Sequence, residues 1–221
     1  MFLKTFLICI LIAVVVGAIA VFNMVRGIIK SAPDIKDIDA TPTGYLSTVL
    51  DNNENEIATL VASGSNRVYV TIDEIPKDLQ HAFVAIEDER FYDHNGIDLQ
   101  GILRAGVRGI THGFHFSEGA STITQQLLKN NVFTGWTSES SFSDKLERKL
   151  QEQYLAVQLE KSVSKDWILE NYLNSINLGQ NTLGVQSASR RYFNKDVSEL
   201  NISESAVIAA ITQNPSRYNP V

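Results

Sequence analysis

Several residue types are scarce in this sequence, and their scarcity excludes some classes of structure. The 221 residues include a single cysteine, Cys9, so an intramolecular disulfide is impossible. The sequence has no internal repeat and no low-complexity segment, which excludes a repeat architecture. Positive charge is in deficit, and the net charge of −6 argues against a general nucleic-acid binder. A local basic patch for an anionic substrate remains compatible with that balance.

One segment lacks charge altogether. Thr5 to Phe22 contains 18 residues without a charged side chain, just enough to cross a bilayer as a helix. Ala18–Ala20 could serve as a signal-peptidase site, but the apolar run is longer than a usual signal core, which favours an uncleaved anchor. Lys4 precedes the run, and Arg26 and Lys30 follow it, so charge alone leaves the orientation open. The rest of the chain, with ordinary composition, suits one sizeable domain.

Extended structure is expected soon after the anchor and a short polar tether. The stretch "YLSTVLDNNENEIATLV" has two β-friendly segments around the turn-prone residues Asp51–Asn55, which predicts a hairpin. The stretch "NRVYVTIDEIP" predicts another extended piece, ended by Pro76.

From Pro76 onward the pattern is mostly helical. Pro76 is suited to a helix start, and apolar residues at three-to-four spacing follow it and recur over 99–110. Ser121 is a good N-cap for "TITQQLLKN". Ser164 is suited to cap the helix that begins directly after Ser164. Similar spacing predicts helices around 146–157, 168–176 and 206–211.

The stretch "AFVAIEDERFYDHNG" runs from an apolar helix face directly into carboxylates and a histidine. A solvated turn is one interpretation. As a metal site, Glu87, Asp88 and His94 are weak, because their spacing matches no closed set of ligands. An acid or base site is the sharper interpretation, because a carboxylate beside apolar surface holds its proton more readily.

Two further clusters suit an anion. Steps of three and four place Lys145, Arg148, Lys149 and Glu152 on one helix face, as a surface salt-bridge ladder or as a cationic face for a phosphate. In "EGASTITQQLLKN", free amides at a helix N-terminus could bind an anion, although routine capping explains the pattern equally well. The side chains at this helix start are Ser121, Thr122, Gln125, Gln126 and Lys129.

The loop 132–142 carries Phe133, Trp136 and Phe142 among polar residues. Aromatic side chains in such a loop suit a membrane interface. The alternative is that Trp136 packs back onto the protein.

The motifs "EDERFYDHNG", "GASTITQQLLKN", "RKLQE" and "ILENYLN" together resemble the peptidoglycan glycosyltransferases (glycosyltransferase family 51). These are the polymerase domains of class A penicillin-binding proteins and the monofunctional transglycosylases. The resemblance extends from about Tyr45 to the C-terminus, where the abrupt end favours a fragment of a two-domain relative. Ala120 departs from a frequent glycine, and Asn177–Leu178 from a commonly aromatic pair.

The resemblance implies a mainly α fold. A lysozyme-like head lobe and a smaller membrane-facing jaw lobe are expected, preceded by a short β-hairpin and an N-terminal transmembrane helix. It also implies a single-pass protein of a bacterial plasma membrane with an extracytoplasmic catalytic domain. The expected divisions are a cytoplasmic tail (1–4), an anchor (5–25), a tether (26–44), a short β segment (45–75) and the glycosyltransferase domain (76–221).

The resemblance further implies polymerisation of lipid II into β-1,4 glycan, with inversion at the sugar and release of undecaprenyl diphosphate. By the family motif Glu87 is the general base for the acceptor hydroxyl, and Glu152 is the second essential glutamate. The implied substrate-binding residues are Asp88, Ser121, Thr122, Gln125, Gln126, Lys129, Arg148, Lys149 and Asn174. No cofactor is required by this interpretation, although Glu152 could act through Mg²⁺ or Mn²⁺ at the diphosphate.

The expected partners are lipid II, the growing lipid-linked glycan, the membrane and other cell-wall synthesis proteins, without nucleic acid. The alternative function is a lysozyme-like hydrolase or lytic transglycosylase that cuts glycan strands. The cations beside Glu152 favour the polymerase, because cleavage of a glycosidic bond releases no diphosphate.

Overall fold

The computed structural model describes residues 2–60, 66–112, 119–133 and 135–220, and these ranges are mainly helical. A two-stranded antiparallel sheet, β1 (Ser47–Leu50) with β2 (Glu56–Leu60), is their one named sheet. Both the helical fold class and the hairpin are therefore confirmed. The helices are α1 (Phe2–Ser31), α2 (Lys77–Glu87), α3 (Leu99–Thr111), α4 (Ile123–Asn131), α5 (Phe142–Leu159), α6 (Lys165–Ser175), α7 (Val185–Phe193) and α8 (Ile202–Ile211).

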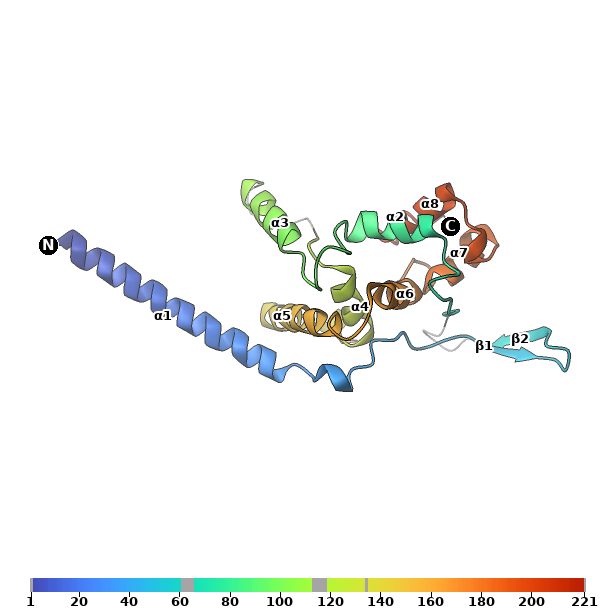
Figure 1. Ribbon diagram of the computed structural model, residues 1–221, viewed down its shortest axis with the longest axis horizontal. Coiled ribbons are helices and arrows are strands. Elements are labelled where there is room, and N and C mark those ends of the chain that lie inside the picture. Colours follow the sequence, from blue (N-terminus) through green and yellow to red (C-terminus); the bar gives the residue numbers. More distant parts are fainter. Residues whose placement is uncertain (1, 61–65, 113–118, 134, 221) are drawn as a thin grey trace.

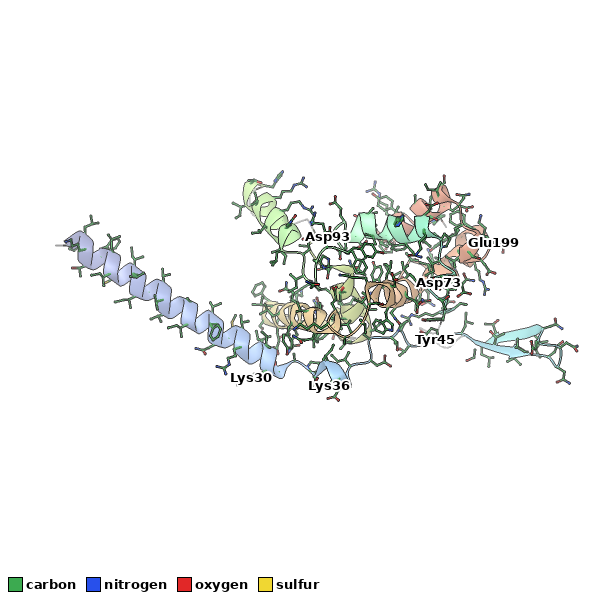
Figure 2. All side chains as sticks on the ribbon, viewed as in Figure 1. Lys30, Lys36, Tyr45, Asp73, Asp93 and Glu199 are labelled. Carbon is green, nitrogen blue, oxygen red and sulfur yellow. The ribbon has the colours of Figure 1, made fainter. Side chains whose placement is uncertain are left out.

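Helix α1 is long and apolar enough to cross a membrane, and it extends away from the other helices (Figure 1). None of its residues is buried. The helix continues to Ser31, so the first part of the expected tether is helical. Lys30 and Lys36 lie where α1 meets the body of the protein (Figure 2). The following chain packs onto this body, because Ala40 is buried and its carbonyl accepts a hydrogen bond from Asn131 Nδ2 at 2.9 Å.

The β1–β2 hairpin projects from the end of the molecule opposite α1 (Figure 1). Its turn is fixed by the Asp51 carboxylate, which accepts hydrogen bonds from the amides of Asn53 and Asn55 at 2.7 and 2.8 Å. The expected third extended piece is wrong over 72–75, which form a turn. The cause is local: the Glu74 carboxylate accepts hydrogen bonds from both the amide and the hydroxyl of Thr71, which folds the chain back on itself.

The hydrophobic core surrounds α4, which packs against α5 and α6. The apolar side chains of α4 that face these neighbours are fully buried. On the other side, α2 packs against α8, and Phe83 of α2 meets Tyr172 of α6 edge-to-face with ring centroids 6.2 Å apart. The end of α2 and the start of α4 are thus held against one rigid core. Ser164 caps α6 as expected, since its hydroxyl accepts from the Trp167 amide.

Helix α3 stands apart from this core (Figure 1). It begins at the predicted residue, and its apolar residues fall on one face as the spacing indicated. That face is exposed: Leu103 keeps 69% of its accessible surface. The other exposed apolar residues of the face are Leu99, Val107 and Ile110.

Candidate active site

Glu87 is the last residue of α2 and points one carboxylate oxygen at α4. Its Oε2 accepts a hydrogen bond from Gln126 Nε2 at 2.8 Å. The Tyr172 hydroxyl in turn donates to Gln126 Oε1 at 3.4 Å. Burial raises the pKa of Tyr172 well above its ordinary value, and the charges of Glu87 and Asp88 raise it further, so the phenol remains a donor. The relay fixes the amide so that its NH₂ group faces Glu87. Within the described residues, Oε1 of Glu87 accepts no hydrogen bond from the protein.

Asp88 is buried and joins α2 to α4. Its carboxylate accepts from the Ile123 amide at 3.0 Å and from His94 Nε2 at 2.9 Å. The Gly96 amide donates to His94 Nδ1 at 3.2 Å, which assigns the ring proton to Nε2. Asp88 and His94 therefore hold Glu87 in place.

The N-terminus of α4 is built differently from our prediction. Thr122, rather than Ser121, is the N-cap, and its side-chain oxygen accepts from the Gln125 amide at 3.2 Å. The Thr122 hydroxyl and Gln125 Nε2 both donate to the Gly96 carbonyl, at 2.9 and 3.1 Å. Both side chains are buried, so they position the helix. Ser121 is left to accept a hydrogen bond from Lys149 Nζ at 2.9 Å.

Glu152 lies at the centre of the cationic cluster on α5 and is fully buried. One of its oxygens accepts from Arg148 Nη1 and the other from Lys149 Nζ, the latter at 2.8 Å. Arg148 Nε also donates to both oxygens of Glu139 at 2.9 Å. The expected helix face is therefore real, but it is a network built around a buried carboxylate rather than an exposed ladder: Arg148 is largely buried, and Lys149 keeps 39% of its side-chain surface. Lys145, the fourth member of the predicted set, is exposed.

Lys129 approaches the same cluster from α4. Burial lowers the pKa of its ammonium, and the charges of Lys149 and Arg148 lower it further, while Glu152 and Glu87 act in the opposite direction. Its ammonium lies 4.6 Å from the centre of the Trp136 ring. Trp136 therefore contacts the protein through Lys129, while it keeps 37% of its accessible surface.

Phe133 packs against the core, whereas Phe142 is exposed. A membrane contact of this loop stays a prediction for Phe142. Residue 134 lies outside the described residues.

A cleft of approximately 490 Å³ opens beside Glu87. A smaller cavity of approximately 130 Å³ shares Glu87 and Ser121 with it. Since Lys149 donates to Ser121, the cationic cluster reaches the edge of the same space that the Glu87 carboxylate faces. The residues that line the larger cleft are Ile86, Glu87, Arg104, Arg108, Gly119, Ser121, Gln126 and Gln213.

A comparison with known protein families matches residues 53–221 to the family described as "Transglycosylase". The chain belongs to the transglycosylase family. Penicillin-binding protein 1A of Clostridium acetobutylicum is 44% identical over 223 aligned positions, which cover 99% of this chain and 27% of that protein. Penicillin-binding protein 1A of Clostridium perfringens (strain 13) is 42% identical, with 99% and 31% covered.

A third relative of this transglycosylase-family chain is penicillin-binding protein 1F of Bacillus subtilis. It is 46% identical over 175 positions, which cover 79% of this chain and 23% of that protein. The chain thus spans between a quarter and a third of the length of most of these relatives.

Of the predicted site residues of this family member, Glu87, Ser121 and Gln126 line the larger cleft, and Asp88 and Thr122 join Glu87 and Ser121 in lining the smaller cavity. Asn174 lines neither. Asn174 is buried, and its amide exchanges hydrogen bonds with both the amide and the carbonyl of Val70 at 3.0 and 2.8 Å. It therefore ties α6 to the segment before α2. Sequence reasoning missed Arg104, Arg108 and Gln213, which line the cleft. The i,i+4 spacing of the two arginines, beside the apolar stripe of α3, was the signal available for two of them.

The surroundings of Glu152 are unfavourable for a divalent metal ion. Each carboxylate oxygen accepts a hydrogen bond from a cationic side chain, so a metal ion bound there would lie beside two positive charges. Within the described residues, no group of three or more His, Cys, Asp or Glu side chains could hold a metal ion.

Proposed function

We propose that this chain polymerises lipid II into β-1,4-linked peptidoglycan strands, with release of undecaprenyl diphosphate. The observation that carries this proposal is the placement of Glu87 in one cleft with the edge of a buried cationic cluster. Transfer from a lipid diphosphate needs both parts: a base for the attacking hydroxyl and positive charge for the leaving group. Membership of the transglycosylase family supports the same reaction.

Glu87 is the proposed general base. The hydroxyl at C4 of the acceptor sugar is a weak nucleophile, and proton removal during attack lowers the barrier. Gln126 occupies one carboxylate oxygen, so the other can take the proton. Attack on the α-linked donor carbon from the face opposite the diphosphate breaks the bond to that group and gives the β-linked product. The proton ends on Glu87, and the electron pair of the broken bond leaves with the diphosphate.

The chain's own cations are the proposed partners of the leaving diphosphate. Lys129, Lys149 and Arg148 would neutralise the charge that develops on it, and Glu152 holds two of them in position. This assignment favours polymerisation over the alternative of strand cleavage, in which no diphosphate is released.

Helices α1 and α3 are the proposed membrane elements. In this proposal α1 is the single transmembrane anchor of a bacterial plasma membrane protein, with the cleft on the extracytoplasmic side. The exposed apolar face of α3 would form the membrane-facing jaw lobe, and the helices around α4 the lysozyme-like head lobe. A lipid-linked substrate would then reach the cleft from the bilayer surface. Other cell-wall synthesis proteins are expected as partners.

The proposal is tested by incubating the full chain with labelled lipid II and separating the products on a gel. We expect a ladder of long polymers, whereas a hydrolase would leave lipid II intact and shorten preformed strands. Glu87→Gln keeps the shape of the side chain and removes the base, so polymer formation should fall about 100-fold or more. Glu54→Gln, at the hairpin turn, is the matched control. Polymerisation by Glu87→Gln at the control rate would remove Glu87 from the mechanism.

A further inference from the structure

Lys129 differs from the other two cations of the cluster in what holds it. Arg148 and Lys149 both donate to Glu152, and each has a second acceptor, Glu139 or Ser121. Across the described ranges, the Lys129 ammonium makes no hydrogen bond or ion pair with a protein acceptor. The ammonium instead lies over the face of the Trp136 ring, 4.6 Å from its centre.

The chain segment that carries the Trp136 ring is held by the rest of the protein, while the residue keeps 37% of its accessible surface. Trp136 begins a short 3-10 turn, Trp136–Ser138, and its backbone amide donates to the Phe133 carbonyl at 3.1 Å. Phe133 packs against the core. At the other end of the turn, the Glu139 carboxylate accepts from Arg148 Nε, and both of these side chains are largely buried. The segment that carries the ring is therefore tied to the core and to the cationic cluster.

The Trp136 ring can stabilise the positive charge of Lys129 without occupying its hydrogen-bond donors. Lys129 is partly buried and lies near two other cations, so its charge is opposed from several sides. A carboxylate would stabilise the charge but would also occupy N–H donors. An aromatic face attracts the ammonium through its quadrupole and accepts none of its hydrogen bonds. All three N–H groups of the ammonium stay available for phosphate oxygens.

We propose that Trp136 is a positioning residue for the diphosphate: its ring holds the Lys129 ammonium beside Arg148, Lys149 and Glu152, with all three donors free for the ligand. This inference rests on the proposed function, because it takes the ligand of Lys129 to be the diphosphate of a lipid-linked sugar. Trp136 does not touch the reacting atoms and acts through Lys129.

The test is a calorimetric titration of the full chain in detergent micelles with farnesyl diphosphate, a soluble prenyl diphosphate. Trp136→Leu removes the aromatic face, and we expect binding about ten-fold weaker, within the range of a partly desolvated cation–π contact. Trp136→Phe keeps an aromatic face and should bind within about three-fold of the original chain. Trp167→Phe, on α6, is the matched control and should bind normally. Affinity of Trp136→Leu equal to or tighter than that of the original chain would overturn the proposal.

A double-mutant cycle separates this proposal from the function on which it rests. In a Lys129→Ala background, Trp136→Leu should cause no further loss of affinity, because the ring acts through that ammonium. If Lys129→Ala itself binds normally, the proposed diphosphate site fails. If Lys129→Ala weakens binding while Trp136→Leu does not, only the role of Trp136 fails.

Fluorinated tryptophan keeps the test decisive should Trp136→Leu fold poorly. In the Trp167→Phe background, tryptophan analogues with increasing numbers of fluorine atoms drain the ring face of negative charge while its shape is nearly unchanged. The affinity for farnesyl diphosphate should fall stepwise with fluorination. A flat series would overturn the proposal.

Discussion

Asp98 shows how much a single residue can contribute next to the cleft. Its carboxylate caps α3 by accepting from the Gly101 amide at 3.0 Å, and it accepts two hydrogen bonds from the Arg90 guanidinium at 2.5 and 3.2 Å. The Arg90 contact, helped by the Gly101 amide, lowers the pKa of Asp98 to about 2. Because the pKa is lower in the folded state, ionised Asp98 stabilises the fold above its unfolded pKa, and that stability is lost as pH falls toward 2.

Asp98→Asn should therefore destabilise the protein in a pH-dependent way. The amide oxygen can still cap α3, but the charge-assisted contact with Arg90 is lost. We expect a loss of about 1–2 kcal/mol at neutral pH. The difference from the original chain should shrink between about pH 4 and pH 2, where the original carboxylate becomes protonated. Urea unfolding in detergent at several pH values measures it, and a difference that does not change with pH would contradict the assignment.

At the scale of single residues, the sequence predicts which charged side chains belong to the site better than it predicts their hydrogen-bond partners. Arg148 and Lys149 could be predicted to share a helix face with Glu152 from their spacing, whereas the assignment of Glu87 came from the resemblance to the family motif. The choice between Ser121 and Thr122 as the cap could not be made, because it depends on Gly96 and Lys149, which approach from distant parts of the chain. The burial of Asn174 is equally non-local, since its partner is Val70.

At the scale of an element, α3 has the least conventional environment. Its length and apolar stripe were predictable from 3.6-residue periodicity. The surroundings of this apolar stripe were not predictable, because periodicity shows that one face of a helix is apolar but does not show what packs against it. In most globular helices such a face packs on the core, whereas here it is exposed. Since Arg104 and Arg108 of the same helix line the cleft, the orientation of α3 affects the site directly.

We expect the apolar face of α3 to enter the bilayer surface. In a Cys9→Ser background, Leu103→Cys would carry a fluorescent label on this face. In nanodiscs, lipids brominated along their acyl chains should quench that label, because heavy-atom quenching requires contact. The control is Asn53→Cys in the hairpin turn, at the far end of the molecule from α1 (Figure 1). If brominated lipid quenches the label at position 103 no more than the label at position 53, the apolar face of α3 does not contact the membrane.

At the scale of the whole molecule, the junction between α1 and α5 connects the membrane segment to the site. Gln151, on α5, donates to the Ile28 carbonyl at 3.3 Å and to the Ser31 hydroxyl at 3.1 Å. Ser31 donates to Glu147 on the same helix at 3.3 Å. Gln151 directly precedes Glu152, so the end of α1 and the cationic cluster are held by neighbouring residues of one helix. The sequence indicated both helices but not that they touch.

Gln151→Ala should loosen this junction without disturbing the core. The loss of these hydrogen bonds is expected to cost about 1 kcal/mol and to lower the melting temperature by about 2–4 °C. Amide exchange over residues 28–31 should accelerate, which hydrogen–deuterium exchange with mass spectrometry can follow in detergent. Gln153→Ala, two positions along α5, is the control and should leave that exchange unchanged. Unaltered exchange in Gln151→Ala would show that other contacts hold the junction.

Gly96 constrains how this protein can change over evolutionary time. Its φ angle is +91°, and a β-carbon there would lie 2.6 Å from the Ala156 backbone of α5. Its carbonyl and amide also bind α4 and His94. A larger residue would force the turn that holds Asp88 away from α5, and with it Glu87 from Glu152. Substitution of Gly96 is therefore opposed by its contacts with α4, α5 and His94, whereas the neighbouring Asn95 is exposed.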